Sequence, residues 1–351
     1  MKLGLNLKPI GNWGGARWDD AHLKLARQLG CESVVAWTPL PAGDGVWHLN
    51  DLLGLKAKAN SHGLELAAIE NFHPLHWDKI LLGEPGRDEQ MDRLQQTIRN
   101  IGKAGIPCMG YNFSIVGVWG HQPKAPNGRG GAKLKSFDAS RIPPEPPPRD
   151  PEVKSYCPMS HWNPTKDIPS ADADEMWQRL TYFLKNLLPT AEEAGVKLAA
   201  HPDDPPVTEL YGFYRCLHSV ESLQRLLDLI PSPSNCLEFC QGTVSEMADV
   251  NILDAIRQFA SQDKIAYVHF RNVSATIPKF AETFIDQGYV DMVAAMKMYR
   301  ACGFQGTLVP DHTPELSFEN PWETGMAYAL GYMRACIQAA DSADRTNIQS
   351  C

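Results

Sequence analysis

The sequence predicts an α/β protein of the (β/α)8 or TIM-barrel class, with a long Pro/Gly-rich insertion after the fourth strand. Along the 351 residues, eight short apolar runs alternate with eight segments of helical periodicity. Such alternation is typical of parallel strands joined by helical crossovers, and eight units in this length suit a closed barrel. The first strand is not followed by Gly-x-Gly-x-x-Gly and no Walker motif is present, which disfavours an open nucleotide-binding sheet.

The first part of the chain supplies four strands and three helices. Short apolar runs predict strands at residues 3–7, 33–37, 64–70 and 107–112. The spacing of apolar side chains predicts helices at residues 18–29, 49–62 and 89–104. Gly30, Gly63 and Gly105 directly follow these helices, where glycine accommodates the left-handed backbone that ends many helices.

Residues 113–171 interrupt this pattern with little periodicity and much Pro, Gly, Lys and Arg. The run at 141–149 (RIPPEPPPR) is too rich in proline for a helix or a central strand. A connection this long is typically functional or a linker. We expect this insert to form a lid or a packing arm over the carboxyl ends of the strands. The alternative is a surface segment that contacts a second subunit.

Regular elements then resume and complete the barrel. Strands are predicted at residues 196–201, 236–240, 265–269 and 307–311. Helices are predicted at residues 174–194, 220–229, 250–259, 291–302 and 325–340, and Ser219 is suited to cap the second of these. We therefore expect one barrel domain over residues 1–351, into which residues 113–171 are inserted.

Composition narrows the classes of partner. The net charge of −8 and the pI of about 5.8 argue against nucleic acid or an anionic membrane surface. The sequence contains no apolar stretch near the roughly 20 residues of a membrane span, and the N-terminus reads as a strand rather than a signal peptide. Nine unevenly spaced cysteines suit buried thiols in a reducing cytoplasm. We expect a cytoplasmic homo-oligomer that acts on a small molecule.

Each of the last four predicted strands ends in a side chain that can bind a metal ion. His201 precedes a PDDPP turn, and Cys240 precedes Gln-Gly-Thr. His269 and Asp311 also come directly before polar segments. The active site of such a barrel lies at the carboxyl ends of its strands. Because these four strands are neighbours, we expect the four side chains to converge.

Two imidazoles, a thiolate and a carboxylate suit Mn²⁺, Fe²⁺ or Zn²⁺, and the thiolate argues against Mg²⁺. A structural zinc site usually takes local pairs such as Cys-x-x-Cys, whereas these residues spread over about 110 positions. A catalytic ion at the barrel mouth is therefore favoured. Taken alone, a strand-end histidine is more often only hydrogen-bonded, and Cys240 would be an ordinary buried thiol.

Polar side chains suited to an anionic polyol follow the same strand ends. Arg271 could grip a carboxylate through its planar guanidinium. Asn272, Asn112 and Asn71 could bind hydroxyl groups, and Tyr111 is a further candidate for substrate binding. The alternatives are turn capping for the asparagines and core packing for Tyr111.

His312 directly follows Asp311 and could act as a general acid or base near neutral pH. The alternative is that it only supports a metal ligand. Asp203 and Asp204 could likewise orient the ring of His201, or simply satisfy the tight turn in which they lie.

The chain resembles the mannonate dehydratase family from residue 1 to about residue 339. The resemblance is carried by residues 195–206 (GVKLAAHPDDPP), 239–243 (FCQGT), 267–273 (YVHFRNV) and 310–312 (PDH), with support from 279–284 (KFAETF) and 290–292 (VDM). The HPDDPP run with three partners in the same order is specific, whereas no single motif would suffice.

The resemblance implies a (β/α)8 barrel that holds Mn²⁺ (or Fe²⁺) through His201, Cys240, His269 and Asp311. It implies a lyase of hexuronate breakdown that removes water from D-mannonate, or a closely related sugar acid, and yields 2-keto-3-deoxy-D-gluconate. The metal and Arg271 would then stabilise the negative charge that develops when the C2 proton leaves.

His312 would transfer a proton in the same reaction, as the base or as the acid. One feature departs from the family, which is credited with a catalytic tyrosine just before the last helix. Here Met326 stands near the expected position and Tyr328 comes slightly later. The insert is also longer than usual for the family.

Two other functions stay open at this point. A metal-dependent isomerase or epimerase of the xylose-isomerase-like type would share the barrel and the metal. Such enzymes usually ligate through Glu, Asp and His, so Cys240 disfavours this alternative. A non-catalytic barrel that binds a sugar acid is favoured by Met326, and it is disfavoured by the complete ligand set with Arg271 and His312.

Overall fold

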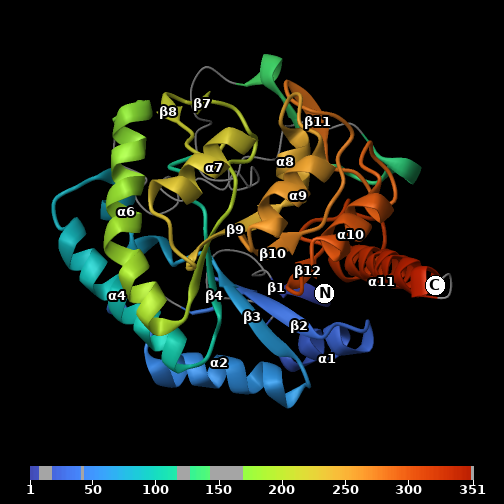
Figure 1. Ribbon diagram of the computed structural model, residues 1–351, viewed down its shortest axis with the longest axis horizontal. Coiled ribbons are helices and arrows are strands. Elements are labelled where there is room, and N and C mark those ends of the chain that lie inside the picture. The colour runs from blue at the N-terminus through green and yellow to red at the C-terminus, as the bar shows by residue number, and fades with distance from the viewer. Residues whose placement is uncertain (8–17, 41–42, 117–126, 143–168, 349–351) are drawn as a thin grey trace.

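The computed structural model describes residues 1–7, 18–40, 43–116, 127–142 and 169–348, and it confirms the predicted barrel. The barrel strands are β1 (Lys2–Leu7), β2 (Ser33–Trp37), β3 (Glu65–Glu70), β4 (Cys108–Tyr111), β6 (Lys197–Ala200), β9 (Asn235–Cys240), β10 (Ile265–His269) and β12 (Thr307–Val309). All eight run parallel, and β1 pairs with both β2 and β12, so the sheet closes on itself. Figure 1 shows the strands in the centre, surrounded by helices.

All eight predicted helices are present around the strands. They are α1 (Asp20–Gln28), α2 (Leu49–Ser61), α4 (Arg87–Lys103), α6 (Ala173–Ala194), α7 (Val220–Leu229), α9 (Ile252–Ser261), α10 (Met292–Ala301) and α11 (Pro321–Ile348). The predicted cap is confirmed, because the Ser219 hydroxyl accepts a hydrogen bond from the Ser222 N–H at the start of α7. Among the described residues, no helix combines the length and the apolar character needed to cross a membrane.

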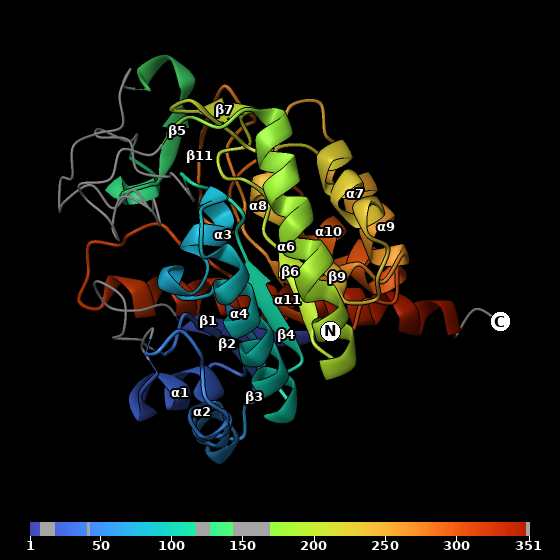
Figure 2. The same ribbon diagram turned by 90° about the vertical axis from the view of Figure 1, so that its left-hand side faces the viewer.

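Several short elements were not predicted. They are α3 (Asp78–Leu82), α8 (Gln241–Glu246) and the 3-10 turns η1 (Pro74–His76), η2 (Arg129–Gly131) and η3 (Ala139–Arg141). Two antiparallel pairs also lie outside the barrel: β5 (Ser136–Asp138) with β11 (Lys279–Ala281), and β7 (Glu209–Leu210) with β8 (Phe213–Tyr214). Of the predicted insert, residues 117–126 and 143–168 lie outside the described residues. Its described part carries β5, which lies beside β11 in Figure 2.

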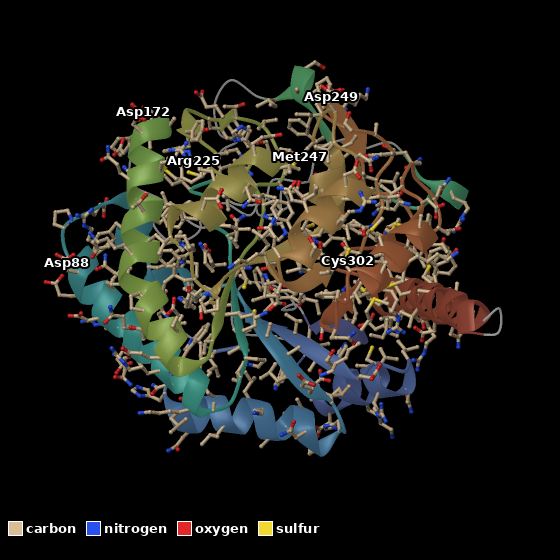
Figure 3. All side chains as sticks on the ribbon, viewed as in Figure 1. Asp88, Asp172, Arg225, Met247, Asp249 and Cys302 are labelled. Carbon is tan, nitrogen blue, oxygen red and sulfur yellow. The ribbon has the colours of Figure 1, made fainter. Side chains whose placement is uncertain are left out.

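The main core lies between the strands and the helices. The buried face of α6 carries the apolar residues that its periodicity indicated: Leu180, Phe183, Leu184, Leu187 and Leu188. Each such side chain stabilises the fold by about 1.5–3 kcal/mol when it is fully buried. Arg225 of α7, which Figure 3 labels, lies 3.9 Å from the ring centre of Trp177 and links α7 to α6 through this cation–π contact.

The barrel interior is apolar at one level and polar at another. A small cluster of Val35, Ala68, Cys108, Ala199, Tyr267 and Val309 is separate from the main core. Because successive side chains of a strand point to opposite faces, Glu238 faces inward between the outward-facing Leu237 and Phe239. By the same alternation, Asn6 faces inward between Leu5 and Leu7. This buried polar level lies directly beneath the candidate site.

Candidate functional site

The ends of β6, β9 and β10 bring three of the predicted metal ligands together. The ladder between β9 and β10 pairs His269 with Cys240, and the N–H of His201 donates to the carbonyl of Tyr111 at 2.8 Å. Ligand atoms of His201, Cys240 and His269 all lie within 4.8 Å of one another. All three side chains are buried. The parallel register therefore builds a compact donor group from residues distant in sequence.

The fourth predicted ligand, Asp311, lies beside this trio. Its Oδ2 is 3.5 Å from Nδ1 of His269 and 3.4 Å from Nε of Arg271. Asp311 has a positive φ of 61°, a left-handed conformation that costs a residue with a side chain about 1–2 kcal/mol. A buried polar residue in such a conformation is typical of functional sites.

Cys240 has a thiol unlike most others in the chain. Burial alone would raise its pKa, but Arg271 and His201 hold the pKa of Cys240 well below its usual range. Burial opposes charge on His201 too, yet Cys240 raises the pKa of that imidazole to about 9. A thiolate is the form that binds metals, and metal binding would displace the imidazolium proton. By contrast, burial raises the thiol pKa of Cys31, Cys108, Cys216, Cys236 and Cys336.

Each histidine is oriented by a second contact. Nδ1 of His201 lies 2.6 Å from the carbonyl oxygen of Pro202, which leaves Nε2 for a ligand. Nε2 of His269 lies 3.1 Å from Oε2 of Glu70 and 3.1 Å from Oε1 of Glu238. Carbonyl and carboxylate groups that bind the far nitrogen of a histidine fix its ring and tautomer in metal sites.

The sequence analysis missed Glu70 and Glu238. Glu70 ends β3 and accepts a hydrogen bond from Nδ2 of Asn6 at 2.6 Å. Burial, and then the neighbouring Glu70, raise the pKa of Glu238 to about 8. Burying a carboxylate is costly unless it has partners. An ionisable residue inside a fully apolar strand, such as Glu238 in the run CLEFC, was the signal that could have identified it.

Arg271 lies at the centre of a buried network of carboxylates. It donates through Nη2 to Asp204 at 2.6 Å and through Nη1 to Glu246 at 2.7 Å. Glu282 lies 3.7 Å from Nη1, and Asp311 lies 3.4 Å from Nε. Only 3% of Arg271 is exposed. The structure thus surrounds Arg271 with carboxylates of the protein, and its predicted grip on a substrate carboxylate stays a prediction.

The Gln-Gly-Thr segment after Cys240 is shaped around Arg271. A Cβ at Gly242 would lie 2.5 to 2.6 Å from three side-chain atoms of Arg271, so only glycine leaves the space. Oγ1 of Thr243 accepts from Nη2 of Arg271 at 3.0 Å. The same oxygen lies 3.1 Å from Sγ of Cys240 and 3.1 Å from Oδ2 of Asp204. This segment therefore couples the thiolate to the arginine network.

His312, the predicted acid or base, lies at the edge of this group. Its Nδ1 is 2.9 Å from Oε2 of Glu282, and its Nε2 is 3.4 Å from Oδ1 of Asp311. The side chain is only partly buried, unlike those of His201, Cys240 and His269. It is therefore placed where a proton could pass between a bound molecule and the protein.

The three predicted asparagines differ in their surroundings. Asn112 is buried, and neither atom of its amide has a hydrogen-bond partner among the described residues. Asn71 has a left-handed φ of 65°, and its N–H donates to the carbonyl of Gly110, as expected for a turn residue. The amide of Asn272 donates to Val290 O at 3.0 Å and accepts from Val290 N at 3.2 Å. Of these three asparagines, Asn112 is the one with a buried amide that has no partner for either polar atom among the described residues.

The predicted candidate Tyr111 does not reach the group, and neither does Tyr328, the tyrosine nearest to the position that the family resemblance marks. Tyr111 follows the inward-facing Gly110, so it points outward and packs 5.0 Å from Phe183, between the ring centroids. Its alternative role in the core is the one that the structure supports. Tyr328 is 42% exposed and binds Arg129 at the surface, while Met326 is buried in the main core.

The donor set fits a divalent transition metal. Its imidazole, thiolate and carboxylate groups are the ligands that such ions take. Nδ1 of His269 has no hydrogen-bond partner within the described part of the chain, although it lies beside the other donors. The buried thiolate and carboxylates also outnumber Arg271, their fully charged partner, so a divalent cation would balance the group.

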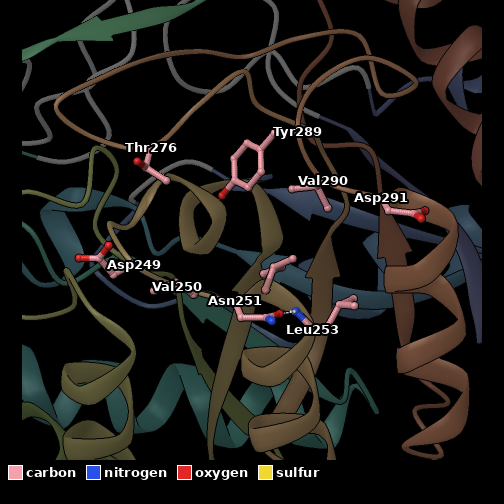
Figure 4. Close-up of a pocket in the computed structure, with 9 residues that line it drawn as sticks. Asp249, Val250, Asn251, Leu253, Thr276, Tyr289, Val290 and Asp291 are labelled. Atoms are coloured by element: carbon pink, nitrogen blue, oxygen red, sulfur yellow. Dashed lines mark hydrogen bonds between the residues drawn. The ribbon is translucent and has the colours of Figure 1, made fainter.

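A separate surface cavity of about 580 Å³ contains none of these residues. It is lined by residues 249–253, 276 and 289–291, near the starts of α9 and α10 (Figure 4). Oδ1 of Asn251 accepts from the N–H of Leu253 at 2.9 Å, as a helix cap does. Asp249 and Asp291 disfavour an anionic ligand in this cavity.

Comparison with known proteins relates this site to one family over the whole chain. The family model described as D-mannonate dehydratase (UxuA) matches residues 1–346. Mannonate dehydratase 2 of Halalkalibacterium halodurans is 33% identical over 314 residues, which cover 84% of this chain and 89% of the relative. Mannonate dehydratase of Thermotoga petrophila is 32% identical over 326 residues, with coverages of 87% and 89%.

Solved structures agree with this relationship. Mannonate dehydratase from Streptococcus suis serotype 2 superposes with a TM-score of 0.81 at 28% identity, covering 98% of this chain and 94% of that chain. An L-ribulose 3-epimerase has a TM-score of 0.60 at 14% identity, with coverages of 98% and 97%, and shares the fold alone. Because the family match spans nearly every residue and curated relatives exceed 30% identity, the chain belongs to the D-mannonate dehydratase family.

Proposed function

We propose that this chain is a hydro-lyase that converts D-mannonate to 2-keto-3-deoxy-D-gluconate with a bound divalent metal ion, Mn²⁺ or Fe²⁺. Membership of the family and full-length relatives named mannonate dehydratase support the reaction. The observation that carries the proposal is the buried group of a thiolate and two imidazoles, beside a carboxylate, at the carboxyl ends of the barrel strands.

The proposed metal ligands are His201, Cys240, His269 and Asp311. His201 would ligate through Nε2 because Nδ1 is engaged by the Pro202 carbonyl. His269 would ligate through Nδ1 because two carboxylates approach its Nε2. This assignment gives each ring one nitrogen for the ion and one for a partner in the protein.

The reaction removes the C2 proton and the C3 hydroxyl, which together leave as water, and the resulting enol becomes the 2-keto acid. A bound divalent ion would supply positive charge at the substrate's carboxylate. Arg271 adds a second, fixed positive charge, held in place by its four carboxylate neighbours. His312 transfers a proton through Nε2, as the base at C2 or as the acid at the C3 hydroxyl.

The proposed contacts to substrate hydroxyls differ in support. The unpartnered, buried amide of Asn112 is well suited to bind one hydroxyl. Asn71 and Asn272 are also proposed to bind substrate hydroxyls, with less support. The N–H of Asn71 and the amide of Asn272 already donate hydrogen bonds to backbone carbonyls of the protein. An isomerase or epimerase is not favoured, because likeness to such barrels extends only to the fold.

The test is turnover of D-mannonate by purified protein reconstituted with Mn²⁺ or with Fe²⁺ under anaerobic conditions, followed by an assay for 2-keto-3-deoxy acids. Chelator-sensitive formation of 2-keto-3-deoxy-D-gluconate is the expected result. A product with the same formula as the substrate would instead indicate an epimerase. If the protein binds one metal ion but forms no product, the assignment of D-mannonate as substrate is wrong.

A further inference from the structure

Glu282 is a buried carboxylate next to the site, and so far it has been given a role only as a neighbour of Arg271. It follows β11 directly and is only 7% exposed. Its Oε2 lies 2.9 Å from Nδ1 of His312, and its Oε1 lies 3.7 Å from Nη1 of Arg271. Glu282 therefore contacts the proposed proton-transfer group and the proposed charge-stabilising group at once.

The two nitrogens of His312 face different partners. Nδ1 meets Glu282, whereas Nε2 is turned to the ligand group and lies 3.4 Å from Oδ1 of Asp311. A neutral imidazole carries one proton, and a carboxylate accepts but cannot donate when it is ionised. If Nδ1–H donates to Glu282, the Nε2 edge of the ring is held toward the site, beside Oδ1 of Asp311.

The surroundings of Glu282 keep it ionised. Burial alone would raise its pKa, but His312 and Arg271 hold the pKa of this carboxyl well below its usual range. An ionised, buried carboxylate forms a strong hydrogen bond with an imidazole N–H. The same arrangement, a carboxylate on Nδ1 that orients a histidine whose Nε2 transfers the proton, serves general-base catalysis in many hydrolases.

The insert forms backbone hydrogen bonds to both of the segments that carry Glu282 and His312. The N–H of Glu282 donates to the carbonyl of Lys135 at 2.9 Å, and β5 of the insert pairs with β11. Lys133 exchanges backbone hydrogen bonds of 3.0 and 2.9 Å with Glu315, three residues after His312. One short stretch of the insert thus links the two loops that carry this pair.

We infer that Glu282 is a positioning residue for His312: it fixes the ring with the proton on Nδ1 and presents Nε2 to the substrate. This inference rests on the proposed dehydratase function for its kinetic consequence, but the state of the His312 ring can be measured without turnover. The arrangement predicts a defect in the chemical step rather than in metal binding or substrate affinity.

The kinetic test compares Glu282→Ala and Glu282→Gln with the wild-type enzyme. Without the carboxylate, kcat is expected to fall about 10–100-fold, as for other groups that orient a functional histidine. Metal content and KM are expected to stay within about twofold, and Glu282→Gln should recover part of the loss because its amide oxygen can still accept from Nδ1–H. Lys279→Ala, on the same strand with an exposed side chain, is the matched control and should retain wild-type kcat.

A spectroscopic test separates this inference from the reaction itself. Protein labelled with ¹⁵N-histidine reports the tautomer of each ring, and His312→Asn identifies the His312 signal. The wild type should show the Nδ1–H form, and Glu282→Ala should lose it. An unchanged tautomer in Glu282→Ala would overturn the inference even if the enzyme is active. If Glu282→Ala loses the Nδ1–H form but the wild type does not turn over D-mannonate, the positioning role is supported and the assignment of the substrate is wrong.

Discussion

The two halves of the barrel contribute different things to the same site. Strands β6, β9, β10 and β12 lead into the four proposed ligands, whereas β1 and β3 contribute Asn6 and Glu70, which reach the site only through His269. Asn6 and Glu70 of the first half thus help to orient the ring of His269, whereas the second half supplies all four proposed metal ligands. Closure of the barrel is what allows this division, because β3 and β10 face each other across the interior without being neighbours.

The largest expected effect lies in the ligand-bearing half. Cys240→Ser should remove nearly all bound metal and activity while the fold is retained, since serine is close in size but does not ionise to give a soft ligand. Metal content by atomic absorption and circular dichroism measure the two properties. Cys236→Ser, on the same strand with a thiol that contacts the Pro233 carbonyl, is the matched control and should keep its metal. Equal metal content in both variants would exclude Cys240 as a ligand.

A substitution in the first half of the barrel should cause a smaller loss of metal binding. Glu70→Gln is expected to weaken metal binding about 10–100-fold, because one of the two carboxylates that orient His269 loses its charge. Competition with a chromogenic chelator gives the affinity. Glu65→Gln, at the exposed start of the same strand, should leave it unchanged. Wild-type affinity in Glu70→Gln would mean that Glu238 alone orients the ring.

The smallest expected effect concerns packing rather than metal binding. Gly242→Ala should destabilise the protein by about 1–3 kcal/mol, because its Cβ would overlap the buried side chain of Arg271. Gly54→Ala, in the exposed interior of α2 with open space around it, should instead stabilise by up to about 1 kcal/mol. Denaturant unfolding of both variants measures the difference. Similar stabilities would show that Arg271 moves freely out of its network.

The same division explains what could be predicted from the sequence. The four proposed ligands could be selected from the sequence because one local pattern, an apolar run that ends in a donor, recurs at successive strands. Glu70 and Glu238 were not, since their role depends on which side chains meet across a closed barrel. Tyr111 was a candidate for the site because it is near a strand end, with core packing as the alternative, and the alternation of the strand turns it outward.

The partners of Arg271 were also beyond local sequence patterns. Asp204, Glu246 and Glu282 come from three separate connections, and only the closed fold brings them to one guanidinium. Eight strands and eight helices followed from periodicity. In contrast, β5 and β11 were not predicted, because each is short and lies in a long connection between barrel elements rather than in the repeating pattern of strands and helices.

The left-handed backbone of Asp311 has a consequence for engineering. At φ 61° a glycine or asparagine would fit with less conformational cost, so a screen that rewards heat resistance alone would tend to replace this residue. Such a variant would gain stability and lose a proposed metal ligand in one substitution. Improvement of this protein for industrial use should therefore hold position 311 constant and take its added stability from remote surface helices.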